Sequence, residues 1–596
     1  MDAICIHWKQ KILENTFMAT IQAKTSRGRK YWYIVESRRI NGKPRPVVLE
    51  YLGKPLDLLR RLRGLTDKLV VKSYSHGGVC ALLDVARKLD VVTSINKYVK
   101  AQRSYMADKP LRHNLTAGIT LLLGAIGRVC MPTSKRGWWN WARTTSCEYL
   151  LRVSLSKIDS QHFWDIMDCI PITAIERIEL EVTRKILRLY KIETDNMMYD
   201  TTNLYTYINS TNSKCSVAQR GKNKQKRNDL RQVGLAMVVT RRDFIPLFHL
   251  TYRGNMNDTV VFGKVLRKIK KRLVDLSLDI EKHTLVFDRG CNSKKNLARV
   301  KRLKLHYVCA LTPAHHLELV EDAESGFREE CVENKTLFVY RDKRVIWEEE
   351  RTIVVYISEK LKEGQLRGIY QSLEKKKKEL RKIQRRLSNP RSRIRNERNI
   401  RKTIETLLKG QYMEGLISYT LQKDEEGRFH MTWRTNLEKL KTLEDRLGFR
   451  ILMTDRHEWS TEEIINAYHG QSAVELAFKN IKSPHHLAIQ PEFHWTDQKI
   501  HVHQFMCVLG YQLSALLWRE ARLKAGFKGS LDRMLDILNN IRLAMLLEKT
   551  KTRGRIKASY NLEEMDDEEK KLMDALKLTD FHTKRPKIKG VGVYTQ

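Results

Sequence analysis

The chain has 596 residues, of which 42% are hydrophobic, so it is too long for a single ordinary core and predicts about two to four domains. It carries 111 Lys and Arg against 69 Asp and Glu, a net charge of +42. This excess points to a polyanionic partner, with nucleic acid first, because phosphates neutralised by basic residues release counterions. An acidic membrane surface is the weaker alternative, since the basic residues are spread along the chain rather than gathered beside an anchor.

The cysteines and the apolar segments argue against a disulfide scaffold and against a membrane protein. The ten cysteines are scattered from Cys5 to Cys507 without a C-x-x-C pair or a zinc-type Cys/His spacing, which is typical of reduced thiols in a cytosol-like compartment. Residues 1–22 lack the apolar segment of a signal peptide, and the most apolar run, 115–126, is too short to span a bilayer. We therefore expect a cytoplasmic protein without a membrane partner.

Residues 20–56 are expected to form a small β-rich unit. Two strand-like runs, 31–35 and 46–49, flank Asn41-Gly42, which is a strong β-hairpin signal. Basic residues stud this unit, so a DNA-contacting role and a merely solvated hairpin are equally good interpretations. These basic residues are Lys24, Arg27, Arg29, Lys30, Arg38, Arg39, Lys43 and Arg45.

Residues 76–187 are expected to be helical and to include a DNA-binding domain. Apolar residues recur there at spacings of three and four, which is the helical period. The segment 135–141 places three tryptophans beside Lys135 and Arg136. Aromatic side chains beside basic ones can stack on exposed bases, but neighbouring tryptophans are more often part of a core.

From residue 190 onward the pattern changes to apolar strands separated by helices. The expected elements, in chain order, are strands at 196–200, 232–240 and 244–252, a helix at 258–273, a strand at 283–288, a helix at 293–303 and a strand at 306–311. Three strands, helix, strand, helix, strand is the order of an RNase H-like core. We therefore predict an α/β fold whose catalytic core is a mixed five-stranded sheet with helices.

The stretch 313–450 interrupts this core and is expected to be an insertion domain that is β-rich and helical. Strand-like runs occur at 336–340, 351–357 and 428–433. Between them, residues 371–400 hold twelve basic side chains and three acidic ones. This segment is either a solvated charged hairpin or an ordered helix with a side that faces DNA.

Core character returns after the insertion, and the chain ends in a charged tail. A capping-box pattern from Ser460 to Glu463 predicts the start of a helix that runs to about Lys482. The expected domains are a β-rich N-terminal unit at 20–56, a helical region at 76–187, the first part of the core at 190–312, the insertion at 313–450, the second part of the core at 451–545 and the tail at 546–596.

One face of this helix combines polar residues in a way that a core stripe does not. Tyr468, Gln471, Glu475 and Lys482 stand at offsets of 0, 3, 7 and 14 and share a face at about 100° per residue. Lys479 lies on the same face. For an isolated helix, a solvent-exposed surface with a Glu475–Lys479 ion pair would be the better interpretation.

Two strands that end in aspartates change that interpretation. Asp200 and Asp288 each close an apolar strand, and in an RNase H-like order these strands are neighbours in the sheet. Each aspartate alone would be explained as a strand-end cap, but together with Glu475 they predict a converging carboxylate triad. Such oxygen ligands suit Mg²⁺ or Mn²⁺, and two ions about 4 Å apart can drive a phosphoryl displacement.

Three short blocks of this sequence resemble the catalytic blocks of DDE transposases of the IS4 type, and most closely the IS1634-like subgroup. The blocks are Tyr199-Asp200-Thr201-Thr202, Val286-Phe287-Asp288-Arg289-Gly290 and Tyr468-x2-Gln471-x3-Glu475-x6-Lys482. The resemblance covers roughly residues 22–530, and Leu52-Gly53 at the end of the first hairpin also fits the start of that subgroup.

The resemblance implies a role for each matching residue. Asp200, Asp288 and Glu475 would be the catalytic, metal-binding triad, with two Mg²⁺ or Mn²⁺ ions. Tyr468 and Lys482 would contact the phosphates of the transposon end, whereas Gln471 stands where the family signature has an arginine. The further candidates for DNA contact are Lys479 and Arg289, although a structural salt bridge is an alternative role for Arg289.

The reaction implied by the resemblance is cut-and-paste transposition, in which the element ends are nicked, usually through a DNA hairpin, and then joined to a target. The implied partners are double-stranded DNA, as terminal inverted repeats and target, and a second copy of the chain in a synaptic complex at the nucleoid of a prokaryotic host. Three alternatives stay open: a structure-specific endonuclease on the same core, a non-catalytic DNA-binding derivative, and a metal-independent RNA-binding protein.

Overall fold

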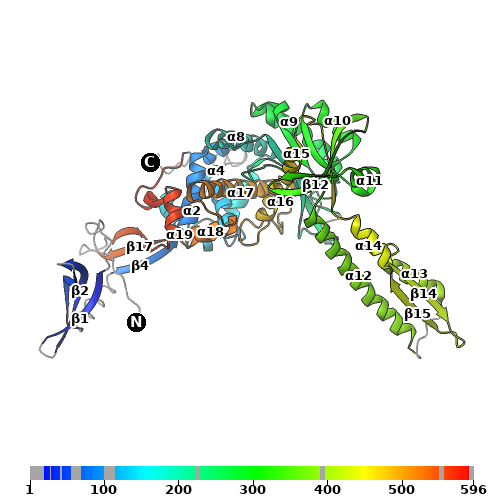
Figure 1. Cartoon of the computed structure of the whole chain (residues 1–596). Coiled ribbons are helices and arrows are strands. Elements are labelled where there is room, and N and C mark those ends of the chain that lie inside the picture. The colour runs from blue at the N-terminus through cyan, green and yellow to red at the C-terminus, as the bar shows by residue number, and fades with distance from the viewer. Residues whose placement is uncertain are drawn as a thin grey trace.

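The structure is a computed structural model, and it describes residues 19–26, 29–40, 43–55, 69–99, 115–221, 227–389, 396–549 and 556–589. The expected Asn41-Gly42 turn and residues 390–395 of the basic 371–400 segment lie outside these ranges. Figure 1 shows a central body of sheet and helices, a small sheet at one end of the molecule and a projecting arm at the other. The arm and the small sheet therefore extend away from the body that carries the predicted site.

The first part of the central sheet has the element order that the sequence predicts. Strands β5 (Asn196–Tyr205), β7 (Arg231–Thr240) and β8 (Pro246–Arg253) form an antiparallel set. Helices α9 (Asp258–Asp275) and α10 (Lys294–Arg302) alternate with β9 (Thr284–Phe287) and β10 (His306–Leu311), which run parallel to β5. These five strands lie in the spatial order β8-β7-β5-β9-β10, so β5 and β9 are central neighbours.

The complete sheet is twice as large as the predicted one, with ten strands. Strand β16 (Phe449–Thr454) pairs antiparallel with β10, and β13 (Glu349–Ile357) then pairs with β16. The strand-like runs expected at 336–340 and 351–357 thus extend the core sheet, because β16 provides the edge to which β13 pairs, whereas the run expected at 428–433 lies in β15 (Phe429–Thr435), outside this sheet. The outer strands are β11 (Arg328–Val332) and β12 (Lys335–Ile346), and the two-residue β6 (Gln219–Arg220) pairs with β7.

The two faces of the sheet bury different cores because neighbouring residues of a strand point to opposite sides. Tyr199 and Phe287 belong to the core on the side of α9, α10 and α11 (Leu317–Gly326). Met198 and Val286 belong to the core on the side of α15 (Thr461–His469), α16 (Ser472–Ile481) and α17 (Asp497–Ala525). The predicted helix from 461 to about 482 is therefore two helices, separated at Gly470 and Gln471.

A cause of that break lies in the packing of Gly470. A Cβ at this position would stand 2.7 Å from the terminal methyl group of Met198 in β5 and 2.9 Å from the backbone oxygen of Ala467, so a larger residue would need both the side chain and the backbone to shift. The backbone N–H of Gln471 donates to the Tyr468 carbonyl at 2.9 Å, which is the tighter pattern of a 3₁₀ turn. The turn leaves α15 and α16 both resting on the sheet.

The helical half of the molecule packs around α17, which is buried on nearly all sides. Its neighbours include α4 (Ala117–Cys130), the most apolar helix, but no helix in the described part of the chain has the length and apolarity needed to cross a bilayer. Trp138 and Trp141 are core residues here, and the Trp138 indole donates to the Leu123 carbonyl. The surrounding helices are α2 (Gly77–Lys88), α3 (Val91–Tyr98), α5 (Trp138–Ala142), α6 (Cys147–Leu151), α7 (Ser160–Asp168), α8 (Ile172–Tyr190) and α18 (Leu531–Asn540).

Three smaller sheets lie outside the central one. Strands β1 (Ala19–Ser26), β2 (Arg29–Ile40) and β3 (Lys43–Gly53) form a three-stranded N-terminal sheet, one strand more than the predicted hairpin. In the range expected to be a charged tail, β17 (Arg542–Lys549) pairs with both β4 (Leu69–Ser75) and β18 (Ile556–Leu562). Helix α19 (Asp567–Ala575) follows and packs on α17 and α18, so this region is integrated into the body.

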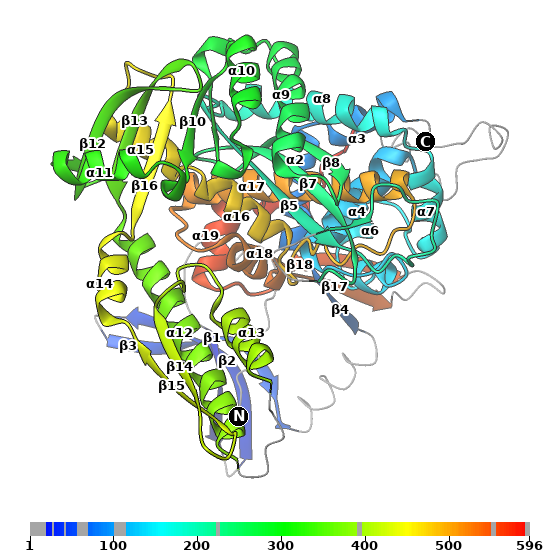
Figure 2. The same cartoon turned by 90° about the vertical axis from the view of Figure 1, so that its right-hand side faces the viewer.

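The projecting arm is built from α12 (Glu359–Leu387), α13 (Glu397–Leu408) and the hairpin of β14 (Ile417–Lys423) and β15 (Phe429–Thr435). Helix α14 (Leu437–Asp445) returns the chain to the body (Figure 2). The arm has its own apolar core, to which α12 contributes Leu373, Leu380 and Leu387. Residues 371–387 of the basic segment therefore lie in an ordered helix that packs on this core.

Candidate active site

Asp200 and Asp288 lie side by side in the centre of the sheet. In the parallel pair of β5 and β9, Tyr199 stands opposite Phe287, and the two aspartates are the residues that follow these partners. Because Tyr199 and Phe287 point into the α9–α10 core, residues one position later point to the other face, where α15 and α16 pack. The side chain of Asp200 is half-buried and that of Asp288 is exposed.

Helix α16 is fixed along β5 by its two ends. At its start, the side-chain amide of Gln471 donates to the Tyr199 carbonyl at 2.9 Å. At its end, the Lys482 ammonium contacts the Thr202 hydroxyl and lies 3.4 Å from the Asn203 carbonyl. Glu475 lies between these two anchors, in the first turn of α16, and its side chain is exposed. The positive end of the helix dipole favours the ionised form of a carboxylate at this position.

Tyr468 reaches the second aspartate from α15. Its ring is buried, with 7% of the residue exposed, and its hydroxyl lies 3.4 Å from Oδ1 of Asp288, to which it donates. The Arg450 guanidinium lies 3.4 Å from the same hydroxyl and 5.6 Å from the ring centroid. In this structure Tyr468 therefore orients Asp288, and its buried ring offers little surface to a phosphate.

The expected polar face of the α15–α16 segment is thus directed at the place where Asp200 of β5 and Asp288 after β9 lie side by side, which we call the β5–β9 edge. Tyr468, Gln471 and Lys482 all contact β5 or the residue that follows β9. The alternative Glu475–Lys479 ion pair is not formed in the structure. Lys479 and Arg289 are exposed, and among the described residues their side chains make neither a hydrogen bond nor an ion pair. They remain near the site without a defined contact.

A fourth carboxylate, Asp258, lies at the same edge and was not predicted as a site residue. It begins α9, and its Oδ1 accepts a hydrogen bond from the Thr201 hydroxyl at 2.8 Å. A Cβ built at Gly290 would stand 3.8 Å from its Oδ2, so Asp258 also faces the loop after Asp288. An aspartate in the first turn of a helix is usually explained by the helix dipole, which is why the pattern alone did not single it out.

The electrostatics of neighbouring groups place the aspartates in one neighbourhood. Burial, together with the charges of Asp258, Asp200 and Asp288, raises the pKa of the Cys291 thiol well above its usual value. Burial and the charges of Asp258 and Asp200 likewise raise the pKa of Tyr252. Within the described ranges, no ion pair neutralises Asp258, Asp288 or Glu475. The edge is therefore a local concentration of negative charge in a strongly basic chain.

This donor set fits hard divalent cations. All its members offer carboxylate oxygens, and such ligands suit Mg²⁺ or Mn²⁺. The oxygens of Asp200, Asp288 and Glu475 do not all lie within 4.8 Å of one another, since among the described residues only Glu492, His494 and His503 form such a group. Two ions about 4 Å apart, each with bonds of about 2.1 Å, need a wider spread of ligands than one ion does.

The Glu492 group is a less suitable cation site, despite its compactness. The Lys135 ammonium lies 2.8 Å from Nε2 of His494, which is one of the potential ligand atoms. Lys135 and Arg128 also supply positive charge that compensates the buried Glu492 carboxylate. We therefore treat the group as a buried polar network and the β5–β9 edge as the candidate active site.

Residues 199–492 match a family model described as the transposase DDE domain. The match supports a DDE transposase. It begins at the residue before Asp200, ends just beyond α16 and includes every residue of the edge described above.

The remaining comparisons add little to this. Among solved structures, a piggyBac transposase in a synaptic complex with hairpin DNA, determined by cryo-EM, is similar with 10% sequence identity and a TM-score of 0.39, over 77% of this chain and 79% of that chain. No curated protein matches the chain. Divalent metal ions are general cofactors of DDE transposases, which agrees with the carboxylate chemistry of the edge.

Proposed function

We propose that the chain is a DNA transposase of the IS4 type, within the IS1634-like subgroup, that cuts and rejoins DNA at the β5–β9 edge of an RNase H-like core. The observation that carries the proposal is the position of Asp200 and Asp288 directly after Tyr199 and Phe287, the last paired residues of two central parallel strands, with α16 anchored along β5 on both sides of Glu475. The strand order β8-β7-β5-β9-β10 supports the RNase H-like assignment.

In this proposal Asp200, Asp288 and Glu475 hold two Mg²⁺ or Mn²⁺ ions. The chemistry that two such ions supply is the activation of water or a 3′-hydroxyl and the stabilisation of the leaving oxygen in an in-line displacement. Tyr468 orients Asp288 through its hydroxyl, and Gln471 and Lys482 hold α16 against β5 so that Glu475 stays over the edge. Asp258 fixes the Thr201 hydroxyl beside Asp200.

The partner in this proposal is duplex DNA, first as the inverted repeats that end the element and then as the target. The net charge of +42 supports a polyanionic partner of this kind. Lys479 and Arg289 are exposed beside the carboxylates and are the proposed contacts to the cleaved phosphates. Bringing two ends together implies two copies of the chain, so we also propose a homodimer in the synaptic complex.

The test uses a supercoiled plasmid that carries the DNA flanking the gene, with and without Mg²⁺. We expect Mg²⁺-dependent nicking at the ends of the element, followed by joined products with a target plasmid. Variants Asp200→Asn, Asp288→Asn and Glu475→Gln should each lose both activities while still binding the plasmid, whereas the exposed control Asp445→Asn should retain them. Cleavage that survives in all three variants contradicts the proposed site, and cleavage without joining identifies an endonuclease instead.

A further inference from the structure

The arm leaves the body from the edge of the sheet that carries the carboxylates. The rung that contains Phe287 of β9 continues through Cys309 of β10 and Met453 of β16 to Ile353 of β13. Asp288 follows Phe287 at the same end of the sheet towards which β13 continues from Ile353 to Ile357, and α12 begins two residues later at Glu359. Since three strand spacings of about 4.8 Å separate β9 from β13, the base of the arm lies about 15 Å from the strand that ends at Asp288.

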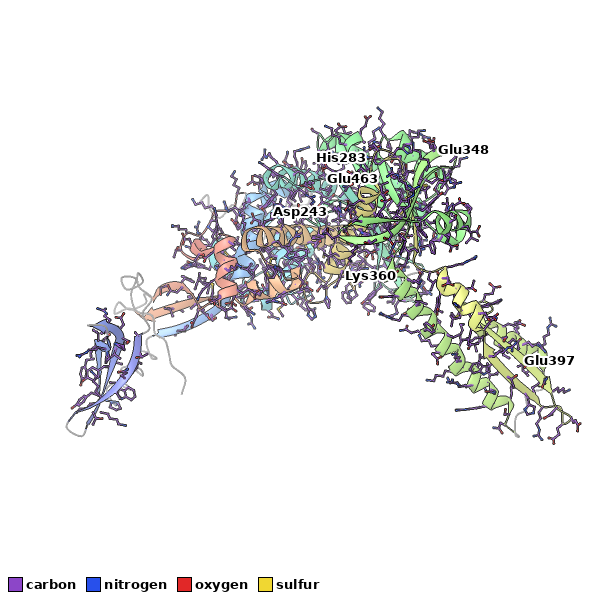
Figure 3. The ribbon with its side chains drawn as sticks, in the orientation of Figure 1. Asp243, His283, Glu348, Lys360, Glu397 and Glu463 are labelled. Atoms are coloured by element: carbon purple, nitrogen blue, oxygen red, sulfur yellow. The ribbon has the colours of Figure 1, made fainter. Side chains whose placement is uncertain are left out.

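The arm then carries a helix far beyond the body. Helix α12 has 29 residues, which corresponds to about 43 Å at 1.5 Å per residue. In Figure 3, Lys360 marks the base of this helix near the body, and Glu397, at the start of α13, lies far out on the arm. The arm's own core makes α12 a supported helix over this length.

One side of α12 presents a row of basic side chains. Lys375, Lys378, Arg381 and Arg385 stand at offsets of 0, 3, 6 and 10, which places them within about 120° on a helix. All four are exposed, and none forms an ion pair with another described residue, in contrast to Lys377 and Lys382, which pair with Glu374 and Glu379. The Arg381 guanidinium lies 6.0 Å from the centre of the Trp433 ring in β15, so the β14–β15 hairpin packs against this member of the row.

The spacing of the row suits the backbone of duplex DNA. From Lys375 to Arg385 the helix rises about 15 Å, and a duplex carries one phosphate charge per about 1.7 Å of its axis. The row lies about 24 to 39 Å along α12 from its start, and one turn of B-DNA is about 34 Å long. With the 15 Å between β9 and the base of the arm, the path from the carboxylates to the row is about 39 to 54 Å, so a duplex that occupies the carboxylate edge and continues along the arm would meet the row one to two helical turns away.

We propose that the row of Lys375, Lys378, Arg381 and Arg385 binds the phosphate backbone of the same DNA duplex that is cleaved at the Asp200–Asp288 edge, about one to two helical turns from the cleaved bond. The inference rests on the proposed function for the identity of the duplex. Lysine and arginine side chains on phosphates position a duplex without reading its sequence, so the row adds affinity and orientation and not specificity.

The test measures the salt dependence of binding, which reports how many phosphates the protein neutralises. The variant K375Q/K378Q/R381Q/R385Q is compared with the parent on a 40-base-pair and an 8-base-pair duplex that end in the flanking DNA of the gene. The slope of log K against log salt falls by about 0.9 for each phosphate that is no longer neutralised, so removal of these four charges should lower it by about 3 to 4 on the long duplex. On the short duplex, which at about 27 Å ends before the row, parent and variant should bind alike.

A matched control removes four exposed lysines elsewhere. In K570Q/K571Q/K577Q/K584Q the same charge is removed from the C-terminal region, so its slope on the long duplex should stay within about one of the parent. The exchange K375R/K378R/R381K/R385K keeps the charge and should restore the parental slope, and thermal unfolding of each variant checks the fold.

An unchanged slope in the quadruple glutamine variant on the long duplex overturns the inference, and so does an equal loss of affinity on the short one. An acidic protein as the true partner of the row would give the first of these results. Asp200→Asn should lack cleavage but keep the parental slope. A parent that binds with the expected slope but never cleaves would contradict the proposed function while leaving the role of the arm intact, so the two failures are distinguishable.

Discussion

The carboxylates of this protein occupy two contrasting environments along the same strand. At Asp200 and its neighbours the acidic side chains are partly or fully exposed, and those of Asp258, Asp288 and Glu475 have no ion pair among the described residues. Glu492, by contrast, is 0% exposed and pairs with the end of β5 through backbone hydrogen bonds to Tyr205 and Tyr207. A carboxylate whose charge is left to the solvent is available to bind a cation, and a buried one must be compensated by the protein.

The protein compensates Glu492 with a network of basic groups. Burial raises the pKa of the Glu492 carboxyl, and the positive charges of Lys135 and Arg128 act against this and favour its ionised form. Burial also lowers the pKa of Lys135, which the Glu492 charge raises in part, and it holds the pKa values of His494 and His503 well below 6.5, so both imidazoles are neutral near pH 7. The network joins β5 to α17 and to the turn before α5. We infer that its role is structural.

The largest expected effect concerns the exposed set. Asp288→Asn should lower Mg²⁺-dependent plasmid cleavage by about three orders of magnitude or more, equivalent to about 4 kcal/mol, because a ligand for the ions is removed. Its free energy of unfolding should stay within about 0.5 kcal/mol of the parent, since the group is exposed and has no ion pair to lose. Gel-based cleavage assays and urea unfolding measure the two quantities. A variant that cleaves normally but unfolds easily would reverse the comparison.

The buried set should respond in the opposite way. Glu492→Ala leaves the Lys135 ammonium buried without its carboxylate, so we expect the free energy of unfolding to fall by about 3 to 5 kcal/mol. The double variant Glu492→Gln with Lys135→Met removes both charges and should recover most of this loss. Urea unfolding of both variants and the parent forms the test, and equal destabilisation in the single and the double variant would show that the two charges are not coupled.

Asp258 should show an intermediate effect on activity alone. Asp258→Asn weakens the acceptor of the Thr201 hydroxyl beside Asp200, so we expect cleavage to fall about 10- to 100-fold, with a higher Mg²⁺ concentration needed for half-maximal rate. The change in Mg²⁺ dependence separates a role at the carboxylate edge from a role as a helix-starting residue, which would alter only stability. Thr201→Val, which removes the same hydrogen bond from the other side, should reproduce the shift.

The smallest expected effect is the acid sensitivity of the buried network. Because the pKa of His503 is far below 6.5 in the folded chain and near 6.5 in the unfolded one, the unfolded chain binds the extra proton as the pH falls. Stability should therefore decrease below pH 6.5, by up to about 2 kcal/mol for this residue between pH 6.5 and 5. Urea unfolding at both pH values should show a shallower decrease in His503→Gln, and an unchanged decrease would mean that other groups dominate.

Local sequence patterns were sufficient for the elements of the site. The apolar runs before Asp200 and Asp288 predict strands that end in carboxylates, and helical spacing predicts a polar face from Tyr468 to Lys482. Strand β9 does end at the residue before Asp288, whereas β5 continues past Asp200 to Tyr205. The order of these strands and helices in the structure is the predicted one. Chain order and periodicity are local properties, so they can be read without knowing any long-range contact.

Long-range pairing decided the size of the sheet, the place of the arm and the position of Asp258. Strand register and packing depend on residues distant in the chain, so local patterns do not predict them. The growth of the sheet from five predicted strands to ten depends on the pairing of β13 with β16, and the place of the arm beside the carboxylates follows from that register. Asp258 reaches the edge only because α9 packs over β5, 57 residues after Thr201. The sequence by itself determined which residues carry the chemistry, and the tertiary structure decided which other groups surround them, since convergence in space leaves no periodic trace in the chain.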